Sequence, residues 1–250
     1  MEINYLLEGS GDKTIVFVHG LSDNLYYWQK LSFELGKDYN VLSYDLRGHG
    51  SSPYAPFTMD ELADDLHDLL LKLDIGKASL VGLSLGGNVV LSFALKYPHM
   101  VEKLVIMSSF SEVDDNLRSK FGEFKTAILK SYEDFYDVII RYVLPEDILN
   151  ENLEALEFYK KEAAKSANLK AIENGIDIGV DFYITDKLKN LNHPALILAG
   201  RDDEITKVNL SEILNENMEN SRLVVFENTK HNLLIGRNIE EILKIIREFL

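Results

Sequence analysis

Seven short runs of apolar, often β-branched residues recur along the chain, and the segments between them read as helical. The predicted strands are residues 4–8, 14–18, 41–44, 78–81, 103–107, 195–199 and 222–226. Several of these runs are almost continuously apolar, which is typical of strands that are buried on both faces of a parallel sheet. The pattern therefore predicts a doubly wound α/β fold, with a mostly parallel sheet of about seven strands flanked by helices.

Two of the intervening segments have a clear helical period. Residues 60–73 repeat their leucines about every 3.6 positions and carry carboxylates on the opposite face. Residues 238–250 show the same pattern, and Asn238 is expected to cap the start of that helix.

The alternation of strands and helices stops between about Ser111 and Asn190. This stretch is rich in helix formers and aromatic residues, so we predict a helical cap inserted before the penultimate strand. Residues 1–110 and 191–250 would then form the core domain, and residues 111–190 the cap. Most of its aromatic side chains are expected to form the core of the cap, and some to line a pocket at the carboxyl edge of the sheet. These aromatic residues are Phe121, Phe124, Tyr132, Phe135, Tyr136, Tyr142, Phe158, Tyr159, Phe182 and Tyr183.

Composition limits the expected cellular location and the possible partners. The chain has 250 residues, 46% of them hydrophobic, which is enough for a sizeable core. It has no stretch of ~20 apolar residues, no basic region before an apolar run at its start, and no cysteine. We therefore expect a cytoplasmic protein that does not span a membrane. The net charge of −15 argues against nucleic acid and anionic membranes as partners, and it leaves monomer and homodimer open.

A lone serine stands between glycines in Gly82-Leu83-Ser84-Leu85-Gly86, directly after a predicted strand and before a predicted helix. In that setting G-x-S-x-G places the serine on a tight, strained turn, and the flanking Gly82 and Gly86 keep the neighbouring backbone clear. The hydroxyl would then project at the carboxyl edge of the sheet. The alternative is an ordinary glycine-rich turn in which Ser84 caps the helix.

A serine nucleophile needs a base, and the base needs an acid that orients it. Of the six histidines, His231 alone lies in a loop between the last strand and the last helix, on the same edge as Ser84. Asp202 and Asp203 follow the penultimate strand, also at that edge, which gives the order Ser, Asp, His along the chain.

The segment His19-Gly20-Leu21 follows another buried strand. Because Gly20 lets the backbone approach a ligand closely, the amide of Leu21 and the amide of Leu85 could together hold an oxyanion. His19 is expected to brace this turn rather than to act as a base.

These motifs together resemble the α/β-hydrolase fold family, nearly from end to end. The resemblance is carried by V-F-V-H-G-L, Y-D-L-R-G-H-G-S-S, G-L-S-L-G-G, L-I-L-A-G-R-D-D-E and the late histidine. It implies that Ser84 is the nucleophile, His231 the general base and Asp203 the acid, since the acid in this family usually stands three residues after the glycine, here Gly200. It also implies that the segment from Asp45 to Ser52 is a structural turn, and that the chemistry needs neither metal nor cofactor.

The resemblance implies a carboxylic ester hydrolase that forms an acyl-enzyme on small to medium, mostly apolar substrates. Small carboxylesterases and lactonases, including 3-oxoadipate enol-lactonase, are the most similar subfamilies. Hydrolases of carbon–carbon bonds, cofactor-free haloperoxidases, a lyase of the same fold and slow-turnover receptors for small molecules share much of the pattern. Two positions depart from it: Lys230 stands before the histidine where a small residue is common, and Thr206 stands where a proline often follows the acid.

Overall fold

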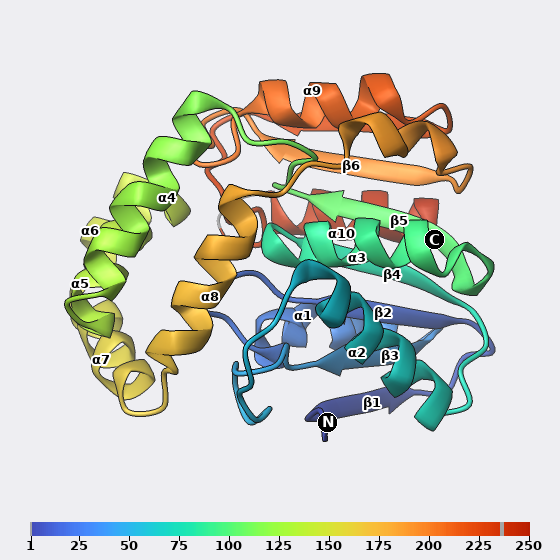
Figure 1. Cartoon of the computed structure of the whole chain (residues 1–250), viewed down its shortest axis with the longest axis horizontal. Helices are drawn as coiled ribbons and strands as arrows, with labels where there is room; N and C mark the ends of the chain where they lie inside the picture. The colour runs from blue at the N-terminus through green and yellow to red at the C-terminus, as the bar shows by residue number, and fades with distance from the viewer. Residues whose placement is uncertain (1, 236–237) are drawn as a thin grey trace.

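All seven predicted strands lie in one sheet. The computed structural model, which describes residues 2–235 and 238–250, orders them β1-β3-β2-β4-β5-β6-β7 (Figure 1). Strand β1 pairs antiparallel with β3, and the remaining neighbours are parallel. The strands are Tyr5–Gly9 (β1), Thr14–Val18 (β2), Asn40–Tyr44 (β3), Ala78–Leu83 (β4), Val101–Met107 (β5), Ala195–Gly200 (β6) and Ser221–Phe226 (β7). The predicted fold class is confirmed.

Helices cover both faces of this sheet. In Figure 1, α2, α3 and α9 lie over the near face, while α1 and α10 lie behind it. Their bounds are Gln29–Leu35 (α1), Met59–Lys72 (α2), Leu85–Lys96 (α3), Val208–Asn217 (α9) and Ile239–Phe249 (α10), and the short helices η1 and η2 span Leu25–Trp28 and Pro98–Met100. Within the described part of the chain, no helix is both long and apolar enough to cross a membrane.

The continuous apolar runs exist because the central strands contribute to two cores. In β2, Val16 and Val18 pack with the helices of the near face, whereas Ile15 and Phe17 pack on the other face. Phe17 stacks on Trp28 with a ring separation of 4.7 Å. Alternate side chains of a strand point to opposite faces, so both sets must be apolar in a sheet that is covered on both sides.

The N-termini of two predicted helices differ in how they are capped. Helix α2 begins with a capping box, in which the Thr58 hydroxyl accepts from the amide of Glu61 and the Glu61 carboxylate accepts from the amide of Thr58. Asn238 does precede α10, but its side chain does not cap that helix. It donates instead to Thr229 Oγ1 at 2.6 Å, across the loop that follows β7.

Between β5 and β6 the chain forms helices rather than strands. These inserted helices are Asp115–Ile128 (α4), Tyr132–Val143 (α5), Glu146–Glu151 (α6), Leu153–Ala164 (α7) and Leu169–Val180 (α8), and Thr185–Asn190 (η3) follows them. Helices α4–α8 lie at the end of the sheet toward which the arrowheads of β5 and β6 point (Figure 1). Their role as a separate cap domain stays a prediction.

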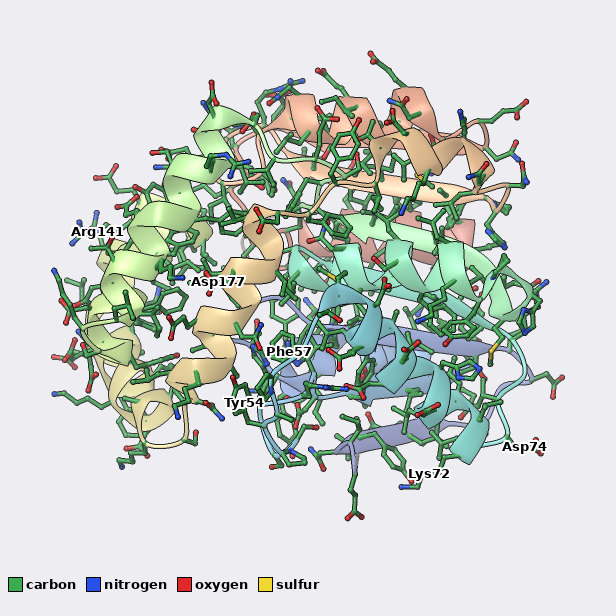
Figure 2. The ribbon with its side chains drawn as sticks, in the orientation of Figure 1. Tyr54, Phe57, Lys72, Asp74, Arg141 and Asp177 are labelled. Carbon is green, nitrogen blue, oxygen red and sulfur yellow. The ribbon has the colours of Figure 1, made fainter. Side chains whose placement is uncertain are left out.

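Helix α8 is fastened to the loop that precedes α2. The Asn174 side chain accepts from the amide of Phe57 and donates to the carbonyl of Phe57, both at 2.9 Å. Figure 2 shows Tyr54 and Phe57 on this loop beside α8. The Asn174 amide thus satisfies both backbone polar groups of Phe57, as pairing with a strand would. These two hydrogen bonds fix α8 against the loop before α2.

The turn after β3 is organised around one carboxylate. Asp45 accepts hydrogen bonds from Asn4 Nδ2 at 2.7 Å and from the amides of Leu25 and Ser51 at 2.8 Å each. Gly50 has φ +51°, and a Cβ atom there would overlap the Asp45 carboxylate. The segment therefore joins the N-terminus, η1 and its own turn.

A largely buried ion pair holds the same turn against α2. Arg47 Nε and an Nη of Arg47 lie 2.6 and 2.7 Å from the two carboxylate oxygens of Asp65. Only 11% and 10% of these side chains are exposed. A bidentate pair of this kind is geometrically specific, and removing one partner leaves the other charge buried.

We expect Arg47→Met to destabilise the protein by about 3–5 kcal/mol, because it leaves the Asp65 carboxylate without its cation. The double variant Arg47→Met/Asp65→Leu should regain most of that loss, since no uncompensated charge remains. Urea unfolding of the three proteins measures both values. Equal stabilities of the single and double variants would contradict this account.

Candidate active site

Ser84 occupies a strained turn between β4 and α3. Its backbone angles are φ +52° and ψ −117°, a region that residues with a side chain rarely adopt. A Cβ atom on Gly82 would overlap the carbonyl of Gly86, and a Cβ atom on Gly86 would overlap the carbonyl of Val18. The two glycines therefore allow the turn to close against itself and against the end of β2.

Strand β5 and the residues that follow it anchor this turn. The amide of Ser84 donates to the carbonyl of Met107 at 2.9 Å, and the Ser109 hydroxyl donates to the carbonyl of Ser84 at 2.8 Å. Ser84 is partly exposed, whereas Leu83 and Leu85 on either side are buried. The hydroxyl therefore faces the cavity at the carboxyl edge rather than the core.

Asp203 and His231 meet between the loops that follow β6 and β7. His231 Nδ1 donates to Asp203 Oδ2 at 2.8 Å, and both side chains are buried. Because the carboxylate only accepts, the bond places the ring proton on Nδ1 and leaves Nε2 with a lone pair. No hydrogen bond joins the Ser84 hydroxyl to His231 among the described residues, a bond that in ligand-free enzymes is often long.

Thr206 belongs to this pair, which sequence reasoning did not foresee. Its hydroxyl donates to Asp203 Oδ2 at 2.8 Å and lies 3.3 Å from His231 Nδ1. The amides of Ile205 and Thr206 donate to Asp203 Oδ1 at 2.8 and 3.0 Å. The only hint in the sequence was that Thr206 replaces a common proline, which could donate from neither its amide nor its side chain. Asp202 is exposed and its side chain lies outside this network.

The predicted oxyanion residues Leu21 and Leu85 both border the same cavity as Ser84. A Cβ atom on Gly20 would lie 3.5 Å from the Ser84 Cβ, so the segment after β2 passes directly beside the serine. Neither the Leu21 amide nor the Leu85 amide donates to another described residue. Leu85 is also the first residue of α3, where amides lack partners within the helix.

His19 holds this segment in place from behind. Its Nδ1 donates to the carbonyl of Gly20 at 2.8 Å, and its Nε2 accepts from the amide of Leu46 at 3.0 Å. Complete burial, together with the neighbouring His49, lowers the pKa of His19 to about 3, against the hydrogen bond to Gly20. The ring is therefore neutral and joins two loops, which is the bracing role predicted for it.

A cavity of about 550 Å³ lies in front of Ser84 and His231. Helices α4, α5 and α7 contribute six of the ten aromatic residues singled out in the sequence, namely Phe121, Phe124, Tyr132, Phe135, Tyr136 and Tyr159. Phe158 and Tyr183 do not border the cavity and are exposed, and Tyr159 lies at its rim, with 65% of its surface exposed. The inserted helices therefore form much of the cavity wall, and that wall is predominantly apolar.

The loop that carries His231 is tied to the inserted helices on both sides of the histidine. Lys230 Nζ donates to the carbonyl of Arg141, which Figure 2 labels on α5, at 2.7 Å. The amide of Asn232 donates to the carbonyl of Val143 at 3.3 Å. These bonds explain the unusual lysine, which caps the carboxyl end of α5 where a cation is favourable.

Among the described residues that border the cavity, Asp23 carries the one carboxylate. Asp23 is partly buried two residues after Leu21, and its Oδ1 accepts from the amide of Asn24 at 2.9 Å. Burial, with a smaller contribution from the nearby Asp45, raises the pKa of Asp23 to about 7, against the hydrogen bond from the Asn24 amide. The described residues contain no group of three His, Asp or Glu side chains arranged to hold a metal ion.

The sequence of this chain is similar to those of known proteins. A family model described as alpha/beta hydrolase fold matches residues 13–237. RutD of Pantoea ananatis, whose name assigns it carbamate hydrolysis, is 30% identical over 198 residues, which cover 76% of this chain and 71% of RutD.

Solved structures are similar over nearly the whole chain. A thermophilic esterase from Thermogutta terrifontis has a TM-score of 0.83 at 25% identity, covering 98% of this chain and 92% of the esterase. An enol-lactonase from Burkholderia xenovorans has a TM-score of 0.89 at 19% identity, covering 99% and 95%, and at that identity the likeness concerns the fold alone.

We expect His231 to give a downfield Nδ1 proton resonance in NMR spectra, because a buried carboxylate and the Thr206 hydroxyl shield that proton from exchange. Asp203→Asn should abolish the signal, and Thr206→Val should shift or broaden it. Asp202→Asn is the matched control and should leave it in place. A signal that survives Asp203→Asn would contradict the assigned tautomer.

We expect Asp23→Asn to stabilise the fold above neutral pH. Since the folded-state pKa lies near 7 and the ordinary value near 4, ionisation of Asp23 favours the unfolded state across that window. Wild-type stability from this group is therefore intact below about pH 4 and lost as the pH rises through about 7. The gain of the variant in urea unfolding should be about 1–2 kcal/mol larger at about pH 8 than at about pH 5.5. A gain that is independent of pH would contradict the assignment.

Proposed function

Since the chain belongs to the α/β-hydrolase fold family, we propose that it hydrolyses carboxylic esters of small to medium, mostly apolar substrates. Ser84 is the proposed nucleophile, His231 the general base and Asp203 the acid that orients it. The observation that carries the proposal is the 2.8 Å hydrogen bond between His231 and Asp203, in which Nε2 is left free beside a cavity that Ser84 also borders.

The proposed reaction passes through an acyl-enzyme. Ser84 Oγ attacks the ester carbonyl carbon while His231 Nε2 takes the hydroxyl proton, and the amides of Leu21 and Leu85 donate to the oxyanion. The tetrahedral intermediate collapses, the carbon–oxygen bond to the alcohol breaks, and His231 returns the proton to the leaving oxygen. Water then repeats the sequence on the acyl-enzyme, with His231 again as base, and releases the carboxylic acid and free Ser84.

The cavity wall supports the substrate class. Its volume of about 550 Å³ suits a small or medium ester, and aromatic and aliphatic side chains from α4, α5 and α7 form much of its surface. We propose that residues 111–190 act as a cap over the site. The bonds of Lys230 and Asn232 to α5 would then couple the position of the cap to the loop of His231.

The relatives support hydrolysis in general and ester cleavage by analogy. The names of the similar proteins include a carbamate hydrolase and an esterase, both of which act at a carbonyl carbon bonded to oxygen. An enol-lactone is an internal ester, so the same three side chains could open it, and lactone hydrolysis is the narrower form of the proposal.

We expect measurable hydrolysis of p-nitrophenyl esters from acetate to about octanoate. Ser84→Ala and His231→Ala should each lower kcat by ~10³-fold or more, because the residual rate comes from the oxyanion site and binding alone. Initial rates measured across the acyl series test this. Full activity in Ser84→Ala would exclude the proposed nucleophile.

A matched pair of variants tests the proposed acid, and two further measurements separate the alternative functions. Asp203→Asn should lower kcat by ~10²–10⁴-fold, because the amide no longer enforces the productive tautomer, while Asp202→Asn should change it less than about threefold. A receptor of this fold would label with an organophosphate at Ser84 yet turn over very slowly. A lyase would release product from its own substrate without any acyl-enzyme detectable by mass spectrometry.

A further inference from the structure

The described wall of the cavity is poor in charged side chains. Among the described residues that border it, Asp23 is the one Asp or Glu, and none is Lys or Arg. Its Oδ1 accepts one hydrogen bond, from the amide of Asn24. Oδ2 has no hydrogen bond and no ion pair with any described residue. A carboxylate in an apolar cavity without a counter-charge is costly, and that cost is removed by a ligand that brings a positive charge.

Two tyrosine side chains, those of Tyr27 and Tyr132, border the same cavity as this carboxylate. Burial is the main cause of the raised pKa of Tyr27, on η1, and of Tyr132, on α5, and the Asp23 charge adds to the rise in both. Tyr27 is held in position because its hydroxyl donates to Asn232 Oδ1 at 2.6 Å. Aromatic faces attract cations, so the two tyrosines and the carboxylate all favour a cationic ligand.

Position along the chain relates this setting to the reaction. Asp23 lies two residues after Leu21, whose amide is one of the proposed oxyanion donors, and the same cavity borders both. A group that contacts Asp23 therefore lies in the same cavity as the scissile bond of a substrate held at Ser84. The net charge of −15 also attracts cationic solutes to the protein as a whole.

We propose that Asp23 selects ester substrates that carry a positively charged amino group close to the scissile carbonyl. This inference rests on the proposed esterase function and names its substrate class. The ammonium would donate to Asp23 Oδ2 and lie against the rings of Tyr27 and Tyr132, while the remaining apolar part of the substrate fills the cavity between α4, α5 and α7. Asp23 is a specificity-determining residue in this proposal and takes no part in bond breaking.

The test uses three p-nitrophenyl esters of nearly the same shape and different charge. Their acyl chains end in a dimethylammonium group, in the isosteric isopropyl group, or in a trimethylammonium group, which is cationic but cannot donate. Wild-type kcat/KM should be highest for the dimethylammonium ester. Asp23→Asn should lower that value by about 10–100-fold, as expected for loss of a charge-assisted hydrogen bond, and should leave the isopropyl ester within about threefold or improve it.

Asp202→Asn is the control for net charge. It removes one negative charge from an exposed turn outside the cavity wall, so the preference for the dimethylammonium ester should persist in it. The preference in wild type should also rise with pH through about 7, where Asp23 ionises, because the raised pKa values of the Tyr27 and Tyr132 phenols keep both uncharged there. The preference of Asp23→Asn should stay flat over that range.

Binding measured without turnover separates this proposal from the function on which it rests. In Ser84→Ala, calorimetry should show tighter binding of the dimethylammonium ester than of the isopropyl ester, and Ser84→Ala/Asp23→Asn should remove the difference. If wild type hydrolyses no ester while this difference is seen, the esterase function fails and the amine preference stands. Equal losses on all three esters in Asp23→Asn, or a preference for the isopropyl ester in Ser84→Ala, would overturn the proposal.

Discussion

The site depends on one close approach of two backbones. Gly86, in the first turn of α3, lies so near the end of β2 that a Cβ atom would overlap the carbonyls of Val18 and His19. Because β2 continues into Gly20 and Leu21, this contact brings the Leu21 amide, the Leu85 amide and the Ser84 side chain to one place. The sheet prepares it, since Val18 pairs with Gly82 in neighbouring parallel strands. Any side chain at Gly86 would force these three groups apart.

The second half of the site repeats the same device on the neighbouring strands. Gly200, the last residue of β6, lies against the carbonyls of Thr229 and Lys230, so that the loops after β6 and β7 pack backbone to backbone. That contact lets Asp203 and His231, 28 positions apart, share a hydrogen bond. Parallel strands deliver their loops to one edge, and glycine at the crossing lets two loops occupy neighbouring space. The chemistry is thus positioned mainly by strand ends, and the contacts of Lys230 and Asn232 with α5 hold the His231 loop in addition.

Features with a local signal could be predicted from the sequence, and features that depend on contacts between loops could not. The strands, the turn at Ser84 and the loop positions of Asp203 and His231 follow from periodicity and glycine spacing. The Thr206 hydroxyl and the Lys230 contact with α5 arise only when separate loops meet, so their letters looked like mere departures from a pattern. At Asn238 a local signal predicted a helix cap that the structure lacks, because the side chain that would have capped α10 binds Thr229 instead.

The charge of Asp23 bears on rate as well as on binding. An ionised carboxylate two residues from the Leu21 amide repels the negative charge that develops on the substrate oxygen, so it opposes the stabilisation that the amides provide. With a neutral ester this repulsion is relieved only when Asp23 takes up a proton, which its raised pKa allows near neutrality. An ammonium group bound at Asp23 cancels the same repulsion while the carboxylate stays ionised. The residue would therefore favour a cationic ester more strongly in the transition state than in the bound ground state, and selectivity of that kind appears in kcat as well as in KM.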